Sequence, residues 1–170
     1  MLRQMLYEYG PWSPQKRFAK VLGSSPMRPN ELLYIDQGSD HGVQVDDIVL
    51  AGERTLVGRV SEVYREVSLV ETIFSRRLKI ASRIFRTLTD GLLMPSNEGL
   101  ELTLLPAEAD VEAGDTVITS GRDGTFFAGF LIGKIIASHV DDHSRLQTAK
   151  VETPINIGKL EMVVVVRRPF

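Results

Sequence analysis

The amino-acid sequence has 170 residues and no cysteine, which excludes disulfide bonds, zinc–thiolate sites and thiol catalysis. Aromatic residues make up only 7% of the chain, so few rings are available to stack on nucleic-acid bases. No apolar run approaches the roughly 18 residues that a membrane-spanning helix needs. No Asn-X-Ser/Thr sequence occurs, and N-linked glycosylation therefore lacks an acceptor. We expect a soluble chain, with any membrane anchor lying outside it.

The residues that are present are typical of a folded globular protein. Hydrophobic residues account for 43% of the chain and charged residues for 25%, unlike the composition of disordered proteins. The formal net charge of −2 argues against general binding of polyanions, but it leaves a local basic patch open. The length suits one ordinary domain or two small ones.

Residues 2–9 carry apolar side chains at helical spacing, and the pattern stops at Gly10-Pro11. An isolated helix of eight residues is marginal in water. The segment is therefore expected to be the end of a longer helix or a flexible end.

The sequence after Pro14 predicts an all-β fold. Short apolar or alternating runs, separated by turn residues, recur about every 8–12 residues, as in a sandwich or barrel. Residues 75–88 fit two interpretations. Their spacing allows a basic amphipathic helix, while Leu78, Ile80 and Ile84 also alternate as in a strand. The β-compatible neighbours favour the strand.

Two parts of the chain resemble each other. GVQVDDIVLAG at 42–52 aligns with DVEAGDTVITSG at 110–121, with Asp47 on Asp115. Downstream, LVGRV at 56–60 aligns with LIGKI at 131–135, with Gly58 on Gly133. Glycine inside a strand occurs where a barrel strand bends or a neighbouring backbone comes close. The repeat predicts two similar β modules, the second carrying seven extra residues between its strands.

The glycine-rich segment 114–135 does not fit a phosphate-binding loop. Gly129–Lys134 is one residue shorter than the G-x-x-x-x-G-K-[ST] motif, and Ile135 stands where the magnesium-binding hydroxyl would be. No helix can be placed after it.

A serine hydrolase would require Ser120 with His139 or His143, and with Asp141 or Asp142. A triad is recognised by geometry that a sequence does not contain, and no G-x-S-x-G motif occurs. The alternative is that Ser120 caps a turn and that residues 141–144 form a solvated hairpin tip. The same alternative applies to metal binding, for which the imidazoles of His41, His139 and His143 lack a suitable spacing.

Two features suggest a binding protein. The basic run Arg76, Arg77, Lys79, Arg83 and Arg86 fits a small nucleic-acid-binding barrel, an exposed strand face, or a rim for an acidic partner. The adjacent rings of Phe126 and Phe127 offer one side chain to fill the barrel and another to anchor a partner. The terminal run MVVVVRR, if it lay at a sheet edge, would pair with another chain.

The repeat, the glycine-rich segment and the ends of the chain together resemble the extracytoplasmic region of the rod shape-determining protein MreC family. The pattern DVxxGDxVVTSGxGGxFPxGxPVGxV of that family is similar to residues 110–135, and the likeness extends over about residues 2–166. The structural motif of the resemblance, together with the repeated glycine of the first module, comprises Gly58, Gly114, Asp115, Ser120, Gly121, Gly124, Phe126, Gly129 and Gly133. Phe127, Arg76 and Arg77 are the expected partner contacts.

The resemblance implies two small six-stranded β-barrels with trypsin-like barrel topology. Residues 1–13 would be the end of a coiled-coil helix, residues 14–74 the first barrel, completed by 144–170, and residues 75–143 the second barrel. Three departures from the family pattern, at Asp123, Phe127 and Leu131, affect the loop of the motif.

The resemblance also implies a function. The protein is expected to be a scaffold of the bacterial cell-wall elongation complex, with no catalytic activity and no cofactor. It would lie outside the cytoplasmic membrane, anchored by a segment that precedes this chain. Its expected partners are a penicillin-binding transpeptidase, MreB, MreD and further copies of itself, and nucleic acid is not among them. The alternative function is a nucleic-acid-binding module that uses the basic run from Arg76 to Arg86.

Overall fold

The computed structural model describes residues 16–168. The helix expected over residues 2–9 lies outside the described residues. Within them the fold is all-β, as predicted, with two short 3-10 helices, η1 (Ser39–His41) and η2 (Ile157–Lys159). The strands are β1 (Lys16–Ser24), β2 (Leu32–Ile35), β3 (Ile48–Ala51), β4 (Thr55–Val63), β5 (Ser68–Thr72), β6 (Ile80–Ile84), β7 (Thr89–Ser96), β8 (Gly99–Pro106), β9 (Thr116–Thr119), β10 (Leu131–Asp141), β11 (Leu146–Glu152) and β12 (Met162–Val166).

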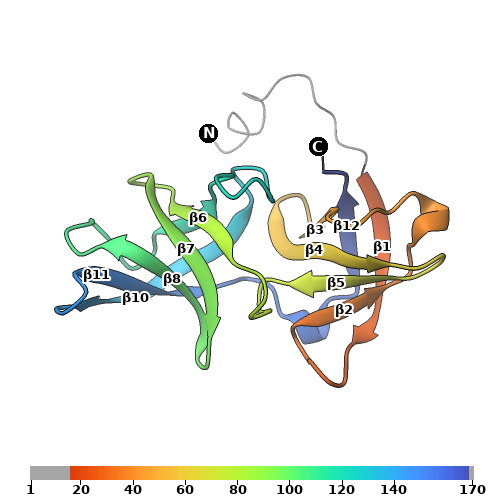
Figure 1. Ribbon diagram of the computed structural model, residues 1–170, viewed down its shortest axis with the longest axis horizontal. Helices are drawn as coiled ribbons and strands as arrows, with labels where there is room; N and C mark the ends of the chain where they lie inside the picture. The colour runs from red at the N-terminus through yellow and green to blue at the C-terminus, as the bar shows by residue number, and fades with distance from the viewer. Residues whose placement is uncertain (1–15, 169–170) are drawn as a thin grey trace. The chain divides into compact units, whose positions relative to one another are not determined.

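The chain divides into two compact units, and the first comprises residues up to Leu78 together with those from Ile155 onward. In this first unit β12 pairs with β1 and β3, β1 with β2, β2 with β5, β5 with β4, and β4 with β3. These antiparallel pairings close a six-stranded barrel around buried aliphatic side chains such as Leu33, Ile35 and Val60. Figure 1 shows β12 and β1, from opposite ends of the chain, side by side.

The second unit runs from Lys79 to Pro154. Its six strands pair in the ring β6-β7-β8-β11-β10-β9, which closes between β9 and β6. The strand predicted within residues 75–88 is confirmed over residues 80–84 as β6, in which Ile80, Ser82 and Ile84 are buried in alternation, while residues 85–88 form a turn.

The two rings have the same neighbour order. Where the second unit reads β6-β7-β8-β11-β10-β9, the first reads β12-β1-β2-β5-β4-β3. The second ring is formed by six strands that follow one another in sequence, β6 to β11. The first ring is formed by β1 to β5 and by β12, which follows the second unit in sequence. The second unit is therefore inserted between β5 and β12, and the trypsin-like topology stays a prediction.

Three sequence expectations differ from this arrangement. The chain was expected to return to the first barrel at residue 144, but β11 pairs with β8 and β10, so residues 144–154 belong to the second unit. The second unit also begins later than expected, at Lys79 and not at residue 75. The run MVVVVRR is not at a sheet edge, because β12 pairs with β1 on one side and β3 on the other.

Candidate functional site

The repeated glycines Gly58 and Gly133 lie where the backbones of two strands almost touch. A Cβ atom on Gly58 would be 1.9 Å from the carbonyl oxygen of Glu71, and one on Gly133 would be 2.1 Å from that of Glu152. No side chain fits at either position, since these distances are far below van der Waals contact. The two glycines thus have matched surroundings, and they hold β4 against β5 and β10 against β11.

The neighbours of the glycines are themselves part of the repeat. Both glutamates belong to a Val-Glu-Thr triplet, at residues 70–72 in β5 and residues 151–153 at the end of β11. This triplet lies outside the alignment described above, although it identifies β11 as the counterpart of β5 and assigns β11 to the second unit.

The acidic turns of the repeat are also equivalent. Each of Asp47 and Asp115 accepts a 2.9 Å hydrogen bond from the backbone N–H three residues earlier. The residues before them, Asp46 and Gly114, have φ angles of 74° and 94°. This left-handed backbone explains the glycine at position 114.

The buried carboxylates of these turns have different partners. Arg86 donates to both oxygens of Asp115, from Nε at 2.7 Å and from Nη2 at 3.1 Å, and it also donates to Asp110. These hydrogen bonds from Arg86 lower the pKa of Asp115. An oxygen of the Asp47 carboxylate lies 3.3 Å from Nε of Arg167, but burial is the larger effect and raises the pKa of Asp47. The two copies thus share a backbone turn, but the pKa values of their aspartates shift in opposite directions.

The loop between β9 and β10 contains most of the motif residues. Gly121, Gly124 and Gly129 all have left-handed φ angles, and Phe126 is buried. The backbone N–H of Ser120 donates to Ala81 of β6. The loop is therefore a compact structural corner of the second unit, with one of its two adjacent rings filling the interior as expected.

The three departures from the family pattern have identifiable contacts. Asp123 accepts hydrogen bonds of 2.9 Å from the backbone N–H of Ala81 and of Thr125, which ties the loop to β6. The ring of Phe127 is half-buried and meets Phe130 edge-on, with 6.1 Å between centroids. Leu131 starts β10, opposite Ile118. Phe127 is thus packed within its own loop on at least one side.

The hydrolase residues are not assembled into a triad in the part of the chain that the structure describes. Ser120 is buried and its Oγ accepts a hydrogen bond from Arg122 N–H. No hydrogen bond among the described residues joins Ser120 to His139 or His143. Asp141 accepts hydrogen bonds from the backbone of His143 and the hydroxyl of Ser144, and the first of these is the main cause of its lowered pKa.

Residues 16–168 contain no group of three or more His, Cys, Asp or Glu side chains placed to hold a metal ion. Nor do they contain a helix with the length and hydropathy needed to span a bilayer.

The basic run is divided between the two units. Arg83 forms an ion pair of 2.9 Å with Asp90, and Arg86 is occupied by its acidic partners. Arg76 and Arg77 are exposed and belong to the first unit. Arg83 and Arg86 are therefore paired with carboxylates of their own unit, and the nucleic-acid alternative gains no support.

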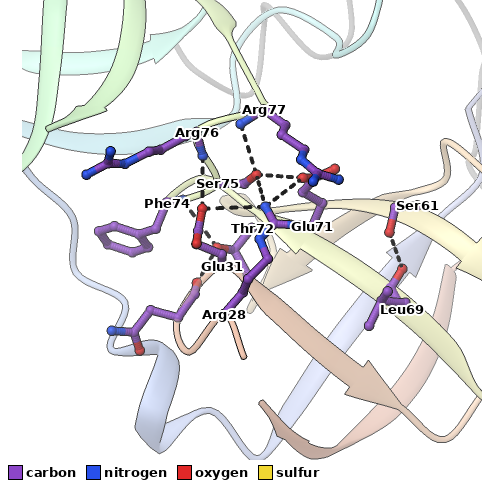
Figure 2. A network of polar contacts seen from close by, with 11 residues as sticks. Arg28, Glu31, Ser61, Leu69, Glu71, Thr72, Phe74, Ser75, Arg76 and Arg77 are labelled. Atoms are coloured by element: carbon purple, nitrogen blue, oxygen red, sulfur yellow. Dashed lines mark hydrogen bonds and ion pairs between the residues drawn. The ribbon is translucent and has the colours of Figure 1, made fainter. Parts of the chain in front are cut away.

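A polar network, which we call the Arg28 clasp, holds the segment that follows β5 (Figure 2). Arg28 Nη2 lies 3.4 Å from Glu31, 3.2 Å from Glu71 and 3.0 Å from Ser75 Oγ. Ser75 in turn donates to Glu71 over 2.6 Å. The backbone N–H of Arg76 donates to Glu31 and is the main reason that the pKa of Glu31 is lowered.

The Arg28 clasp fixes the loop between β1 and β2 to the chain that leaves the first barrel. Thr72 Oγ1 adds a hydrogen bond to the carbonyl of Asn30, and the backbone N–H of Arg77 donates to Ser75 Oγ. Of these residues only Arg76 and Arg77 are expected from the sequence to have a functional role. Nothing in the local sequence pattern marks Glu71 as a buried carboxylate.

Comparison with protein families gives a match over most of the chain. The family model described as "Rod shape-determining protein MreC, barrel core" matches residues 21–167. A cell shape-determining protein MreC from Listeria monocytogenes is 28% identical over 156 residues, which cover 88% of this chain and 52% of the relative. The MreC protein of Escherichia coli K12 is 26% identical over 144 residues, covering 82% and 38%. The chain spans about half the length of the curated relatives it matches, or less.

Solved structures show the same fold. An MreC structure from Listeria monocytogenes superposes with a TM-score of 0.83 at 26% identity, covering 98% of this chain and 84% of that one. A structure described as a complex between penicillin-binding protein PBP2 and MreC from Helicobacter pylori gives a TM-score of 0.69 at 14% identity, covering 91% and 99%.

Proposed function

The chain belongs to the rod shape-determining protein MreC family, and we propose that it is a non-catalytic scaffold that binds and positions the proteins of peptidoglycan synthesis. The observation that carries this proposal is the family match over residues 21–167, which include all twelve strands except the first residues of β1. The family's relatives are named cell shape-determining proteins. The proposed role is positional: the barrels present surfaces that prefer one conformation of a partner over another.

The first proposed partner is a penicillin-binding transpeptidase. A solved structure is described as a complex between PBP2 and the MreC protein of Helicobacter pylori, and that protein shares the fold of this chain. MreB, MreD and a second copy of the chain are further proposed partners. We place the barrels outside the cytoplasmic membrane, where a peptidoglycan transpeptidase works.

The proposed contact residues are Phe127, Arg76 and Arg77. The two arginines are exposed on the segment that the Arg28 clasp holds, so their backbone is fixed while their side chains face solvent. Arginine and aromatic side chains, phenylalanine included, are enriched in protein interfaces relative to the rest of the surface. Phe127 is less exposed than the two arginines, because its ring also packs on Phe130.

The proposal is tested by measuring binding of this chain to the extracytoplasmic part of the PBP2-type transpeptidase from the same organism, by biolayer interferometry. We expect saturable binding that weakens about tenfold in the double variant Arg76→Glu, Arg77→Glu. Arg145→Glu, a reversal in the hairpin between β10 and β11, is the matched control. Absence of saturable binding, with both proteins folded, would contradict the transpeptidase as a partner.

A further inference from the structure

The first unit carries a loop that has only a short counterpart in the second unit. Strands β1 and β2 are joined by residues 25–31, whereas the equivalent strands β7 and β8 are joined by Asn97 and Glu98 alone. The second ring closes with this short turn, so closure of such a barrel does not require the longer loop. The longer loop contains two members of the Arg28 clasp, Arg28 and Glu31. The clasp is therefore an addition to the repeated barrel.

The equivalent glutamates of the two units differ in burial. Glu71 and Glu152 occupy the same place in the two Val-Glu-Thr triplets. Glu152 is exposed, whereas Glu71 is only 8% exposed and has an oxygen 3.2 Å from Nη2 of Arg28. Burying a carboxylate is unfavourable because it loses hydration, and a paired arginine often does no more than offset this loss. Stability of the barrel therefore does not explain why Glu71 is buried.

Ser75 joins the loop to the chain that follows β5 (Figure 2). It is fully buried, and its Oγ donates a hydrogen bond of 2.6 Å to Glu71. The same Oγ accepts hydrogen bonds from Arg28 Nη2 at 3.0 Å and from the backbone N–H of Arg77 at 3.2 Å. A hydroxyl has one donor and two acceptor sites, so all the sites of Ser75 are used. Such a network favours one arrangement, because any other leaves a buried polar group unsatisfied.

The Arg28 clasp ends on the backbone of two successive arginines. The backbone N–H of Arg76 donates to Glu31 at 3.2 Å, next to the bond from Arg77 to Ser75. Both arginine side chains are exposed. Buried ionic groups contribute little net stability, and their best-attested use is to specify one conformation. The conformation that this network specifies is that of the backbone at residues 76 and 77.

We propose that the Arg28 clasp is a positioning device, in which the added loop holds the backbone of Arg76 and Arg77 in one conformation for a partner and is separable from closure of the barrel. The proposal rests on the function proposed above for the contact that these two arginines make. A contact made from a fixed backbone loses less conformational entropy on binding than the same contact made from a flexible segment. The clasp residues thus strengthen binding through the two arginines.

The test opens the Arg28 clasp without leaving a charge buried. Arg28→Met combined with Glu71→Gln removes the ion pair and keeps a polar side chain at position 71. Glu31→Ala is a milder second variant, because the side chain of Glu31 is 26% exposed. The matched control is Arg83→Met with Asp90→Asn, which removes an ion pair of 2.9 Å from the second unit.

Amide hydrogen exchange followed by NMR measures the positioning directly. We expect both clasp variants to accelerate exchange at Arg76 and Arg77 about tenfold or more, and the control to leave it unchanged. Exchange at Val60, whose N–H donates to the carbonyl of Asp47 within the barrel, should change by less than about threefold. Unchanged exchange at the two arginines would overturn the proposal. Equal acceleration at Val60 would also overturn it, because the clasp would then only stabilise the barrel.

Binding to the extracytoplasmic part of the PBP2-type transpeptidase gives a second readout. We expect Arg28→Met with Glu71→Gln to weaken binding about fivefold, but less than about twofold when Arg76→Glu and Arg77→Glu are already present. Equal weakening in both backgrounds would overturn the positioning role, because the clasp would act independently of the arginines. Absence of binding by the unmodified chain would contradict the proposed transpeptidase contact, and the exchange rates would still decide whether the clasp positions the two residues.

Discussion

At the scale of single residues, the closest constraint on the sequence is the contact of Gly58 and Gly133 with the backbone of the next strand. We expect Gly133→Ala to lower the free energy of unfolding by about 3 kcal/mol, because the new methyl group meets the carbonyl of Glu152 and the backbone cannot move aside cheaply. Gly58→Ala should behave alike, since its surroundings are equivalent. Chemical denaturation followed by circular dichroism measures both.

Gly158→Ala provides the control for these substitutions. An added Cβ there would lie 3.5 Å from the Asn156 side chain, an ordinary contact, so stability should change little. If Gly133→Ala proved as stable as Gly158→Ala, β10 and β11 could move apart at this point, and their close approach would not require glycine at position 133.

The pair formed by Arg86 and Asp115 should make stability depend on pH. The arginine holds the pKa of Asp115 below its ordinary value of 3.8, so its stabilising effect is full above that value and is lost as the pH falls through the lower, folded-state pKa. We expect Arg86→Gln to reduce the denaturation midpoint at pH 7 and to reduce it much less at about pH 2.5. A difference between the two proteins that stays constant with pH would contradict this account.

Residue types and their repeat could be predicted from the sequence, but their contacts could not. The alignment of Asp47 with Asp115 and of Gly58 with Gly133 predicted equivalent positions, and both pairs are equivalent in the structure. The same alignment does not predict the carboxylates' partners, Arg167 and Arg86, because these residues lie just after β12 and β6, outside the aligned segments. Opposite shifts in pKa therefore follow from tertiary placement alone.

At the scale of elements, β12 is the strand on which closure of the first barrel depends. The fragment of residues 79–154 contains all six strands of its ring in sequence, so we expect it to fold alone. The fragment of residues 16–78 lacks β12 and exposes the edges of β1 and β3, so it should not. Fusing residues 155–168 in front of residue 16 through a short turn should restore folding, since Lys16 lies opposite Val166. Dispersed amide NMR spectra report folding in each case.

A well-dispersed spectrum from residues 16–78 without the C-terminal segment would show that five strands suffice. A second test of whether the first barrel needs β12 is to add residues 155–168 as a separate peptide. The peptide should bind to the five-stranded fragment and make it fold.

The existence of most strands followed from alternation and turn residues, but the membership of strands in barrels did not. The alternation of residues 146–152 fits a strand of either barrel. Their pairing with Leu100 and Leu102 of β8 assigns them to the second unit. Likewise, the valine run of β12 has the composition of any buried strand. Hydrophobic pattern indicates which face of a strand is buried but not which neighbours it pairs with.

At the scale of the whole molecule, the connection between the units should determine the order of folding. The pairs that join β1 to β12 are 142 to 150 residues apart in sequence, from Lys20 with Met162 to Lys16 with Val166. Closing such long loops slows folding, whereas every pairing of the second unit is local by comparison. Pulsed hydrogen exchange during refolding should therefore protect amides of β6 to β11 before those of β1 and β12. Simultaneous protection of both sets would contradict this order.

The neighbouring positions of β1 and β12 have a mechanical consequence. Tension applied between residues 16 and 166 would act across one pair of antiparallel strands, at the end where both enter the barrel, and would peel them apart one rung at a time. While β1 and β12 stay paired, the force passes directly from one strand to the other and does not act on the inserted unit. Force applied between these residues would thus act on the second unit only after the first barrel has opened.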